Sequence, residues 1–416
     1  MDASVRLDHT LVAMESANAV HAMLELGFPA APGAEERAPL HVSLVLDRSG
    51  SMSGPKLDAT KACATHLVRR LRPDDELAIV TFDDEVTLVA GLDGVDGDKL
   101  ASAIAGIWPG GSTNLSGGWL KGLEELRRST GDGPRAVVLL TDGQANVGVV
   151  EPERLVGMAS GARATGAVTS TIGFGADFDE QLLSDMADAG GGNAHFAATP
   201  DAAPAIFAEE FDGLAATVAQ NVSVEIRPCE AVEVLAVLND YPATAVPGGV
   251  QLALGDAWGG EHRRLVLRLG IQAVAELGTK RVADLCIRWT DVTGTPAMHE
   301  LTVPVLVNVA PGAVIGEDDV DGAVVEEVIV LEAAQAEREA RKHADAGDYG
   351  AAQDLLLQSA RRLRRMAPSS PRGAELLDLA AAMDTSSGSM SPEGWSPMAS
   401  KDMHYRARRS SRRRQS

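Results

Sequence analysis

Residues 41–51 read His-Val-Ser-Leu-Val-Leu-Asp-Arg-Ser-Gly-Ser, and this stretch decides the fold prediction. Its first six residues form a short, mainly apolar run, which is typical of a strand buried on both faces of a helix-covered sheet. Pro55 follows at a position suited to the first turn of a helix. The stretch therefore predicts a strand, a loop and a helix in that order.

The same alternation continues along the chain. Further strands are expected at 77–82, 136–141, 167–172 and 194–196, with an edge strand at 86–89 and intervening helices at 115–128, 152–164, 179–189 and 201–218. Strand–helix alternation over about 180 residues predicts the α/β class, with a doubly wound, mostly parallel, Rossmann-like sheet. We assign this unit to residues 39–218.

The segments before and after the α/β unit have different patterns of apolar and polar residues. Alternating apolar and polar residues over 219–312 predict an antiparallel β-sandwich, and residues 1–38 are expected to add strands to it, which would make the α/β unit an insertion. Residues 318–384 are rich in Ala and Glu and predict a C-terminal α-helical hairpin region with a third helix near 374–383. Residues 385–416 are rich in Ser, Pro, Met and Arg, so we expect a disordered basic tail.

The charge is distributed unevenly. The chain carries a formal net charge of -22, but Ser386 to Ser416 hold seven Lys/Arg and two Asp/Glu. The acidic body disfavours nucleic acid and anionic membranes, so nucleic-acid binding is not expected of it. The tail leaves several alternatives open: contact with phosphates of nucleic acid or lipid, folding back on the acidic body, or recognition by a partner.

The cysteine content and the apolar segments indicate in which cellular compartment the protein is expected. The three cysteines, Cys63, Cys229 and Cys286, are too scattered for a disulfide framework or a zinc site. The first residues lack a basic and then apolar signal pattern, and no window approaches the roughly 20 apolar residues of a spanning helix. We therefore expect a cytoplasmic protein without a transmembrane segment.

Oxygen-bearing residues gather where the predicted strands end. Asp47, Ser49 and Ser51 follow the first strand, Asp142 follows the strand at 136–141, and Thr113 lies in the loop Gly110-Gly111-Ser112-Thr113-Asn114. Ligands of doubly wound sheets bind at the carboxyl ends of the strands. Carboxylate and hydroxyl oxygens without Cys or His favour a hard cation, Mg²⁺ or Mn²⁺, over zinc. An alternative is that Ser49 and Ser51 merely cap the helix near Pro55.

Asp-x-Ser-x-Ser, then Thr in a Gly-rich loop, then Asp after an apolar strand resembles the metal-ion-dependent adhesion site (MIDAS) motif of von Willebrand factor type A domains. The resemblance covers about Leu40 to Val218, and all motif positions match, which makes it specific. It implies direct coordination of the metal by Ser49, Ser51 and usually Thr113. It further implies that Asp47 and Asp142 act directly or through water. The whole layout is similar to bacterial proteins labelled von Willebrand factor A or calcium-activated chloride channel-like. We do not expect a channel, because no segment of the sequence can span a membrane.

The resemblance implies a function in recognition. A protein partner would offer a Glu or Asp carboxylate that completes the coordination of the metal. Relatives of this kind pair with an AAA+ ATPase of the MoxR type, which here would act in trans because this chain has no Gly-x-x-x-x-Gly-Lys-Ser/Thr loop. Two alternatives stay open: a structural or assembly protein whose metal only stabilises the fold, and binding of nucleic acid or a membrane surface by the tail.

Catalysis is not expected. Gly-x-Ser-x-Gly is absent, and Ser49 has no nearby histidine in the sequence that would make it a nucleophile. His41, His66 and His195 are dispersed, so we interpret them as structural or surface residues rather than bases. Trp108, just before the Gly-rich loop, either borders the binding face or packs beneath that loop.

Overall fold

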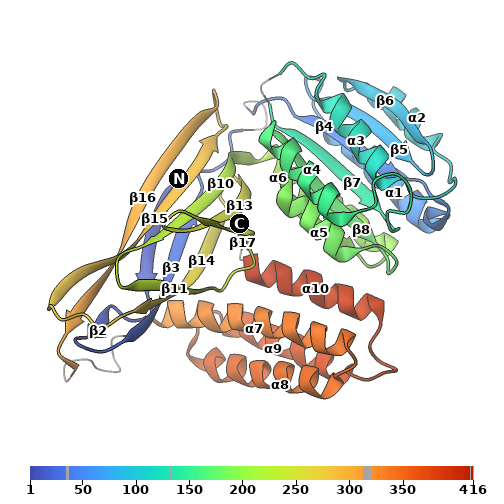
Figure 1. The fold of residues 1–416 in the computed structure, drawn as a ribbon. Helices are drawn as coiled ribbons and strands as arrows, with labels where there is room; N and C mark the ends of the chain where they lie inside the picture. Colours follow the sequence, from blue (N-terminus) through green and yellow to red (C-terminus); the bar gives the residue numbers. More distant parts are fainter. Residues whose placement is uncertain (34–36, 132, 313–319, 413, 416) are drawn as a thin grey trace.

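The computed structural model describes residues 1–33, 37–131, 133–312, 320–412 and 414–415. Figure 1 shows an α/β unit on one side, a β-sandwich on the other, and a group of C-terminal helices below both. The predicted α/β class, with a mostly parallel sheet, an additional antiparallel sheet and C-terminal helices, is confirmed.

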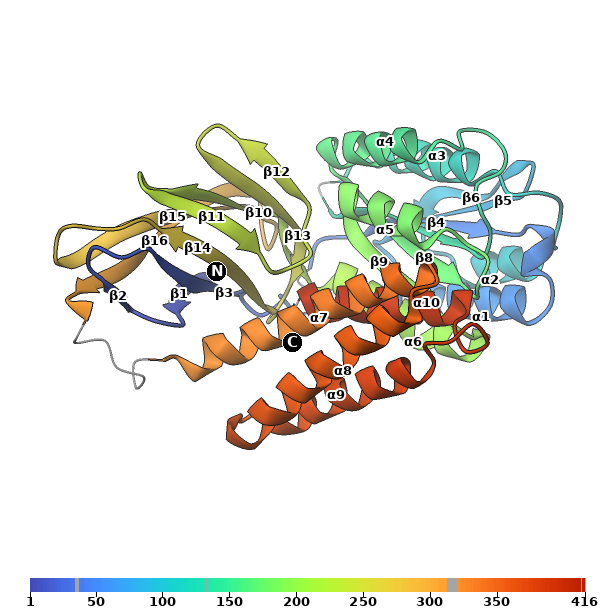
Figure 2. The same cartoon turned by 60° about the horizontal axis from the view of Figure 1, so that its bottom comes forward.

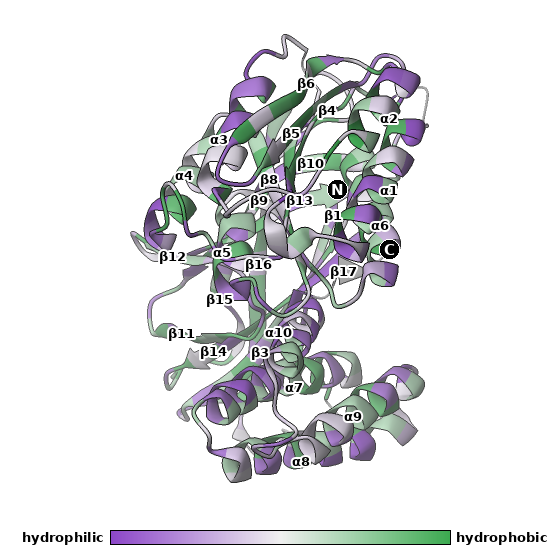
Figure 3. Cartoon of the chain, turned by 90° about the vertical axis from the view of Figure 1, so that its right-hand side faces the viewer, coloured by the Kyte–Doolittle hydropathy of each residue, from purple (hydrophilic) through white to green (hydrophobic). Residues whose placement is uncertain are grey.

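The sheet of the α/β unit has the strand order β6-β5-β4-β7-β8-β9. Strand β6 runs antiparallel at one edge, and the other neighbours pair in parallel. The four inner strands are buried almost throughout, as their apolar sequences require, and Figure 3 colours β4 and β5 largely as hydrophobic. The strands are β4 (His41–Asp47), β5 (Glu76–Phe82), β6 (Val86–Gly94), β7 (Arg135–Thr141), β8 (Ala167–Phe174) and β9 (Gly191–Ala197).

Helices cover both faces of this sheet. One face packs on α1, α2 and α6 through a core that includes Leu67, Ile104 and Phe211, and the other packs on α3, α4 and α5 around Trp119 and Leu155. The helices are α1 (Pro55–Arg70), α2 (Gly97–Ala105), α3 (Leu115–Leu126), α4 (Pro152–Ala164), α5 (Glu180–Ala189) and α6 (Ala203–Ala215), with short 3-10 turns η1 (Gly50–Met52) and η2 (Pro200–Ala202).

Two sheets enclose a separate apolar core and form the sandwich. The first has the order β1-β3-β14-β11, and the second has the order β12-β13-β10-β15-β16-β2. Strand β3 precedes the α/β unit and pairs along its whole length with β14, which follows it, so the α/β unit is inserted between sandwich strands. The strands are β1 (Asp2–Leu7), β2 (Leu11–Ala13), β3 (Asn18–Gly27), β10 (Thr217–Pro228), β11 (Val232–Val237), β12 (Ala243–Val246), β13 (Gly249–Trp258), β14 (His262–Ile271), β15 (Gly278–Asp291) and β16 (Ala297–Ala310).

The C-terminal helices begin after the sandwich. Helices α7 (Gly322–Asp345) and α8 (Tyr349–Met366) form the antiparallel hairpin, with a turn at Gly347, whose φ is +83°. Then follow η5 (Ala367–Ser369), α9 (Gly373–Gly388) and α10 (Pro397–Arg412). The expected start of this region at 318–319 lies outside the described residues. Helix α7 also packs on the sandwich, because Val324, Val328 and Leu331 contact Met23 and Val266.

The C-terminal segment differs from the prediction of disorder over 385–416. Residues 397–412 form α10, which lies between the α/β unit and α7 (Figures 1 and 2), and β17 (Arg414–Gln415) pairs with β14. The basic side chains find acidic partners: Arg406 binds Glu337, while Arg408 and Arg412 both bind Asp188. Of the three alternatives for the tail, the structure has the one in which it folds back on the acidic body.

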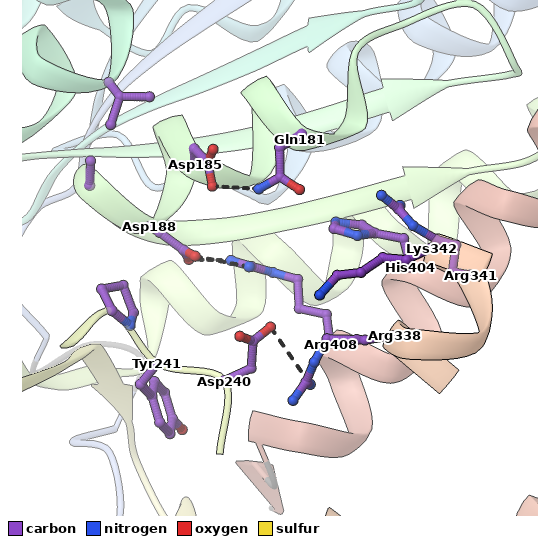
Figure 4. A pocket seen from close by; sticks show the side chains of 13 residues that line it. Gln181, Asp185, Asp188, Asp240, Tyr241, Arg338, Arg341, Lys342, His404 and Arg408 are labelled. Carbon is purple, nitrogen blue, oxygen red and sulfur yellow. Dashed lines mark hydrogen bonds and ion pairs between the residues drawn. The ribbon is translucent and has the colours of Figure 1, made fainter. Parts of the chain in front are cut away.

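These ion pairs lie at a junction of all three parts of the molecule. Figure 4 shows Arg408 of α10 pointing at Asp188 of α5, beside Arg338 of α7 and Asp240 of the sandwich. The Asp240 and Arg338 side chains approach to 3.9 Å, and a cavity of about 440 Å³ lies between them and α5. Helix α10 therefore connects the α/β unit to the sandwich and to α7. None of the described helices is both long and apolar enough to cross a membrane.

Candidate metal centre

The fold brings the expected metal-binding residues to the carboxyl edge of the parallel sheet. Asp47 is the last residue of β4, and Asp142 directly follows β7, the neighbouring strand. Ser49 and Ser51 lie in the loop after β4, and Thr113 lies just before α3. Ser51 is exposed, whereas the other four residues are buried. The group therefore reaches from the protein interior to the surface.

Hydrogen bonds connect four of these residues. The Ser49 backbone N–H donates to Asp47 Oδ1 at 2.7 Å, and the Ser49 and Ser51 hydroxyls are 3.2 Å apart. The Ser51 hydroxyl donates to Asp142 Oδ1 at 2.7 Å. Thr141 Oγ1, which the sequence did not single out, donates to Asp47 Oδ2 at 2.5 Å. These bonds hold both carboxylates and both serines in one cluster.

Thr113 reaches this cluster through its own loop. Its backbone N–H donates to Asn146 Oδ1 at 3.0 Å, which fixes the loop against the segment after β7. A Cβ added at Gly143 would lie 3.0 Å from the Thr113 hydroxyl oxygen, so this hydroxyl lies close to Gly143. Glycine at 143 keeps that space open. The Thr113 hydroxyl therefore lies beside the backbone of Gly143, the residue that follows Asp142.

The serines do not act as caps of the following helix. The N-cap of α1 is Gly54, with φ +77° and no side-chain cap hydrogen bond. Ser49 stands at the N-cap position of η1, also without a side-chain cap hydrogen bond. Met52, inside η1, is fully buried and anchors the turn in the hydrophobic core. The hydroxyls of Ser49 and Ser51 are thus engaged with each other and with Asp142, not with helix ends.

A second carboxylate network positions the Gly-rich loop. Asp83 accepts hydrogen bonds from the backbone N–H groups of Glu85 and Gly111 and pairs with Arg48 at 3.1 Å. The Gly110 N–H donates to the Arg48 carbonyl at 2.7 Å. A Cβ at Gly110 would lie only 1.7 Å from Asp83 Oδ2, so any other residue there would displace the loop. Asp83, which directly follows β5, could have been noticed in the sequence by its place at a strand end.

The cluster brings two buried carboxylates close together. Burial raises the pKa of Asp47 to about 6, the nearby Asp142 adds to this, and the hydrogen bonds from Ser49 and Thr141 oppose it. Lys56 Nζ contacts Asp142 Oδ2. No group of three or more His, Cys, Asp or Glu side chains that could hold a metal occurs in the described part of the chain. The oxygen atoms gathered in this cluster belong to two carboxylates and to hydroxyl groups. Such oxygen donors suit Mg²⁺ or Mn²⁺.

The histidines near the sheet have other partners. His41 Nδ1 lies 2.7 Å from Glu76 Oε2 and 2.9 Å from Ser129 Oγ. His195 Nε2 lies 2.7 Å from the buried carboxylate of Glu210. Both histidines are thus held in structural pairs.

Comparison with known proteins agrees with the fold of the α/β unit. Residues 41–209 match the family of the von Willebrand factor type A domain. This chain therefore contains a von Willebrand factor type A domain. The uncharacterized protein sll0103 of Synechocystis is 30% identical over 178 residues, which are 42% of this chain and 42% of that protein. The alignment thus spans less than half the length of that curated relative.

Two solved structures share the wider arrangement around the type A domain. A von Willebrand factor type A protein from Catenulispora acidiphila superimposes with a TM-score of 0.70 and 17% identity, over 94% of this chain and 89% of that chain. The ArnB paralog VWA2 from Sulfolobus acidocaldarius has a TM-score of 0.62 and 16% identity, over 99% of this chain and 98% of its own. At these identities the likeness shows the fold, including the sandwich and the helices.

Proposed function

We propose that the type A domain binds Mg²⁺ or Mn²⁺ through Asp47, Ser49, Ser51, Thr113 and Asp142, and that a protein partner binds to this metal. The observation that carries the proposal is the hydrogen-bonded cluster of two buried carboxylates and two serines that reaches the surface at Ser51. When bound, the cation would supply a coordination position that a Glu or Asp carboxylate of the partner completes.

Each residue has a role in this proposal that follows from its surroundings. Asp47 is oriented by Thr141 and by the backbone of Ser49, so it acts as a fixed charge beneath the site. Ser51 is exposed and marks the side from which a partner approaches. Thr113 stands on a loop of its own, so it joins the site from a second direction. None of these groups has a histidine partner among the described residues, which supports binding rather than catalysis as the task of the site.

A second candidate function is purely structural. Asp47 and Asp142 are buried together, and a cation beside them would stabilise the folded domain even without any partner. The two candidates differ in what Thr113→Ala should do. Loss of the hydroxyl should abolish partner binding while the fold survives if the site recognises a ligand. Loss of stability alone, with partner binding retained, would favour the structural role.

The first experiment measures metal binding by the purified chain, by calorimetry with Mg²⁺ and by the free Mn²⁺ signal in electron paramagnetic resonance. A capture experiment from native lysate then compares Mg²⁺ with EDTA, using Asp47→Ala as the control, and includes a MoxR-type ATPase among the partners sought. A partner retained only in Mg²⁺ and lost with Asp47→Ala supports metal-bridged recognition. A partner retained equally in all three conditions contradicts it.

A further inference from the structure

Lys56, which belongs to none of the five expected metal-binding positions, reaches into the metal centre. It is the second residue of α1, and its ammonium contacts Asp142 Oδ2. Asp142 has no exposed side-chain surface, and its other oxygen accepts the hydrogen bond of Ser51 at 2.7 Å. One oxygen of Asp142 thus faces the serines and the other faces a lysine of the same chain.

The charges of the cluster explain why this contact matters. Asp47 and Asp142 are both fully buried, and a buried carboxylate without a counter-charge is costly. Among the described residues, Lys56 is the cationic side chain that pairs with either of them. A divalent cation at the same place would have to bind against the positive charge of Lys56, or displace its ammonium from Asp142.

Two neighbouring parts of the chain hold Lys56 in place: the start of α1 and the loop after β8. Gly54, with φ +77°, turns the chain so that Pro55 begins α1, and the next residue, Leu57, is buried against the sheet. On the other side, a Cβ built at Gly175 would lie 3.6 Å from Lys56 Cε, so the lysine stem lies along the loop after β8. The side chain is 28% exposed, which leaves it room to move outwards.

We propose that Lys56 is a competing internal cation. It neutralises Asp142 when no metal is bound, keeps the metal-free domain folded, and lowers the affinity of the site for divalent cations, so that metal binding is readily reversible. Lys56 is a positioning residue in this scheme because it acts through Asp142. The inference rests on the proposed metal site.

The test compares Lys56→Met, Lys56→Gln and Lys56→Arg with the wild-type chain. Lys61→Met is the matched control, because Lys61 lies on the same helix and its ammonium binds the Ala105 carbonyl at 3.2 Å instead of Asp142. Mn²⁺ affinity is measured by electron paramagnetic resonance at fixed ionic strength, and thermal unfolding is measured in EDTA and in saturating Mn²⁺.

Removal of the positive charge of Lys56 should raise the affinity for Mn²⁺ and lower the stability of the metal-free protein. For Lys56→Met and Lys56→Gln, the Mn²⁺ affinity should rise by roughly tenfold or more, because a positive charge next to the cation is gone. Their unfolding temperature in EDTA should fall, and Mn²⁺ should restore it. Lys56→Arg and Lys61→Met should behave as the wild type does in both measurements.

Other results separate this inference from the proposed function. Unchanged or weaker Mn²⁺ affinity in both neutral variants, while the wild type binds Mn²⁺, overturns the competitor role alone. A fall in stability in EDTA that Mn²⁺ does not restore also overturns it. Should the wild-type chain bind neither Mn²⁺ nor Mg²⁺, the proposed function itself fails and the inference fails with it. If Lys56→Met does not fold in EDTA, the Mn²⁺ affinity is measured with Lys56→Gln instead.

Discussion

The ring of Tyr405 stacks on the ring of Phe196, with centroids 5.4 Å apart and planes inclined by 16°. Phe196 belongs to β9, the edge strand of the type A domain, and Tyr405 belongs to α10, at the far end of the chain. Tyr405 is 7% exposed and is part of the same core as Trp119 and Leu155. The C-terminal helix therefore completes the hydrophobic core on one face of the type A domain.

Tyr405→Ala should destabilise the protein and release α10 from the type A domain. Loss of a buried aromatic ring costs roughly 3–5 kcal/mol in comparable cores. Chemical denaturation would measure the loss in free energy of unfolding, and limited proteolysis would detect cleavage between α9 and α10. Tyr405→Phe keeps the stacked ring and should be close to the wild type. An alanine variant as stable and as protease-resistant as the wild type would show that α10 does not depend on this contact.

The titration of His404, which is buried beside Arg341 and Arg408, should lower the stability as the pH falls from about 6.5 towards 4. The raised pKa of Asp47 acts in the opposite direction below about pH 6, so the effect of His404 is the difference between the wild type and a His404 variant. Burial and the charges of Arg341 and Arg408 lower the pKa of His404 to about 4, below its ordinary value of 6.5. The unfolded chain then binds the proton more readily than the folded chain across this interval, so acid favours unfolding by at most about 3 kcal/mol.

The measurement is the free energy of unfolding at pH 7.5, 5.5 and 4.5 for the wild type and His404→Gln. The variant should have a smaller loss between these pH values, because glutamine does not titrate. His66→Gln, at an exposed position of α1, serves as the control and should keep the wild-type slope. An identical pH profile for His404→Gln and the wild type would argue against this origin of the slope.

Mg²⁺ should stabilise the wild-type chain and not Asp142→Ala. A ligand that binds only the folded state at 100 times its Kd adds about 2.7 kcal/mol to the free energy of unfolding. The alanine variant lacks one of the two buried carboxylates, so its thermal unfolding should be the same in Mg²⁺ and in EDTA. Asp84→Ala, at an exposed position near the Gly-rich loop, should keep the Mg²⁺ effect. Equal stabilisation of Asp142→Ala would move the metal to another site.

Trp108→Ala should weaken partner binding without changing metal affinity. The Trp108 side chain is 72% exposed, with Lys61 Nζ 5.5 Å from the ring centroid, so it does not pack beneath the loop. We therefore expect it to border the proposed binding face. Tryptophan is enriched among the few interface residues that dominate affinity once a partner covers them, and truncation of such a residue to alanine costs roughly 2 kcal/mol or more. Surface plasmon resonance with a captured Mg²⁺-dependent partner would measure the change. Stability should stay within about 0.5 kcal/mol of the wild type.

Much of the candidate metal centre could be predicted because its arrangement depends on topology. The parallel strands of a doubly wound sheet have their carboxyl ends at the same edge. Residues that directly follow adjacent strands therefore lie near one another at that edge. Asp47 and Asp142 follow adjacent strands, and the structure places their carboxylates in one hydrogen-bonded cluster with Ser49 and Ser51. The roles of Lys56 and Thr141 could not be predicted, because they depend on which way a side chain points after the backbone has folded.

The sequence by itself determined the α/β class, the sandwich and the convergence of the oxygen-bearing loops, since local periodicity and strand order suffice for these. Only the tertiary structure shows that the basic C-terminal segment is folded, with residues 397–412 in α10. Its residues have the composition of a disordered segment, and α10 is held by partners from far along the chain, among them Asp188, Glu337 and Phe196. Such long-range ion pairs and ring contacts leave no periodic signal in the segment itself, so only the folded chain reveals them.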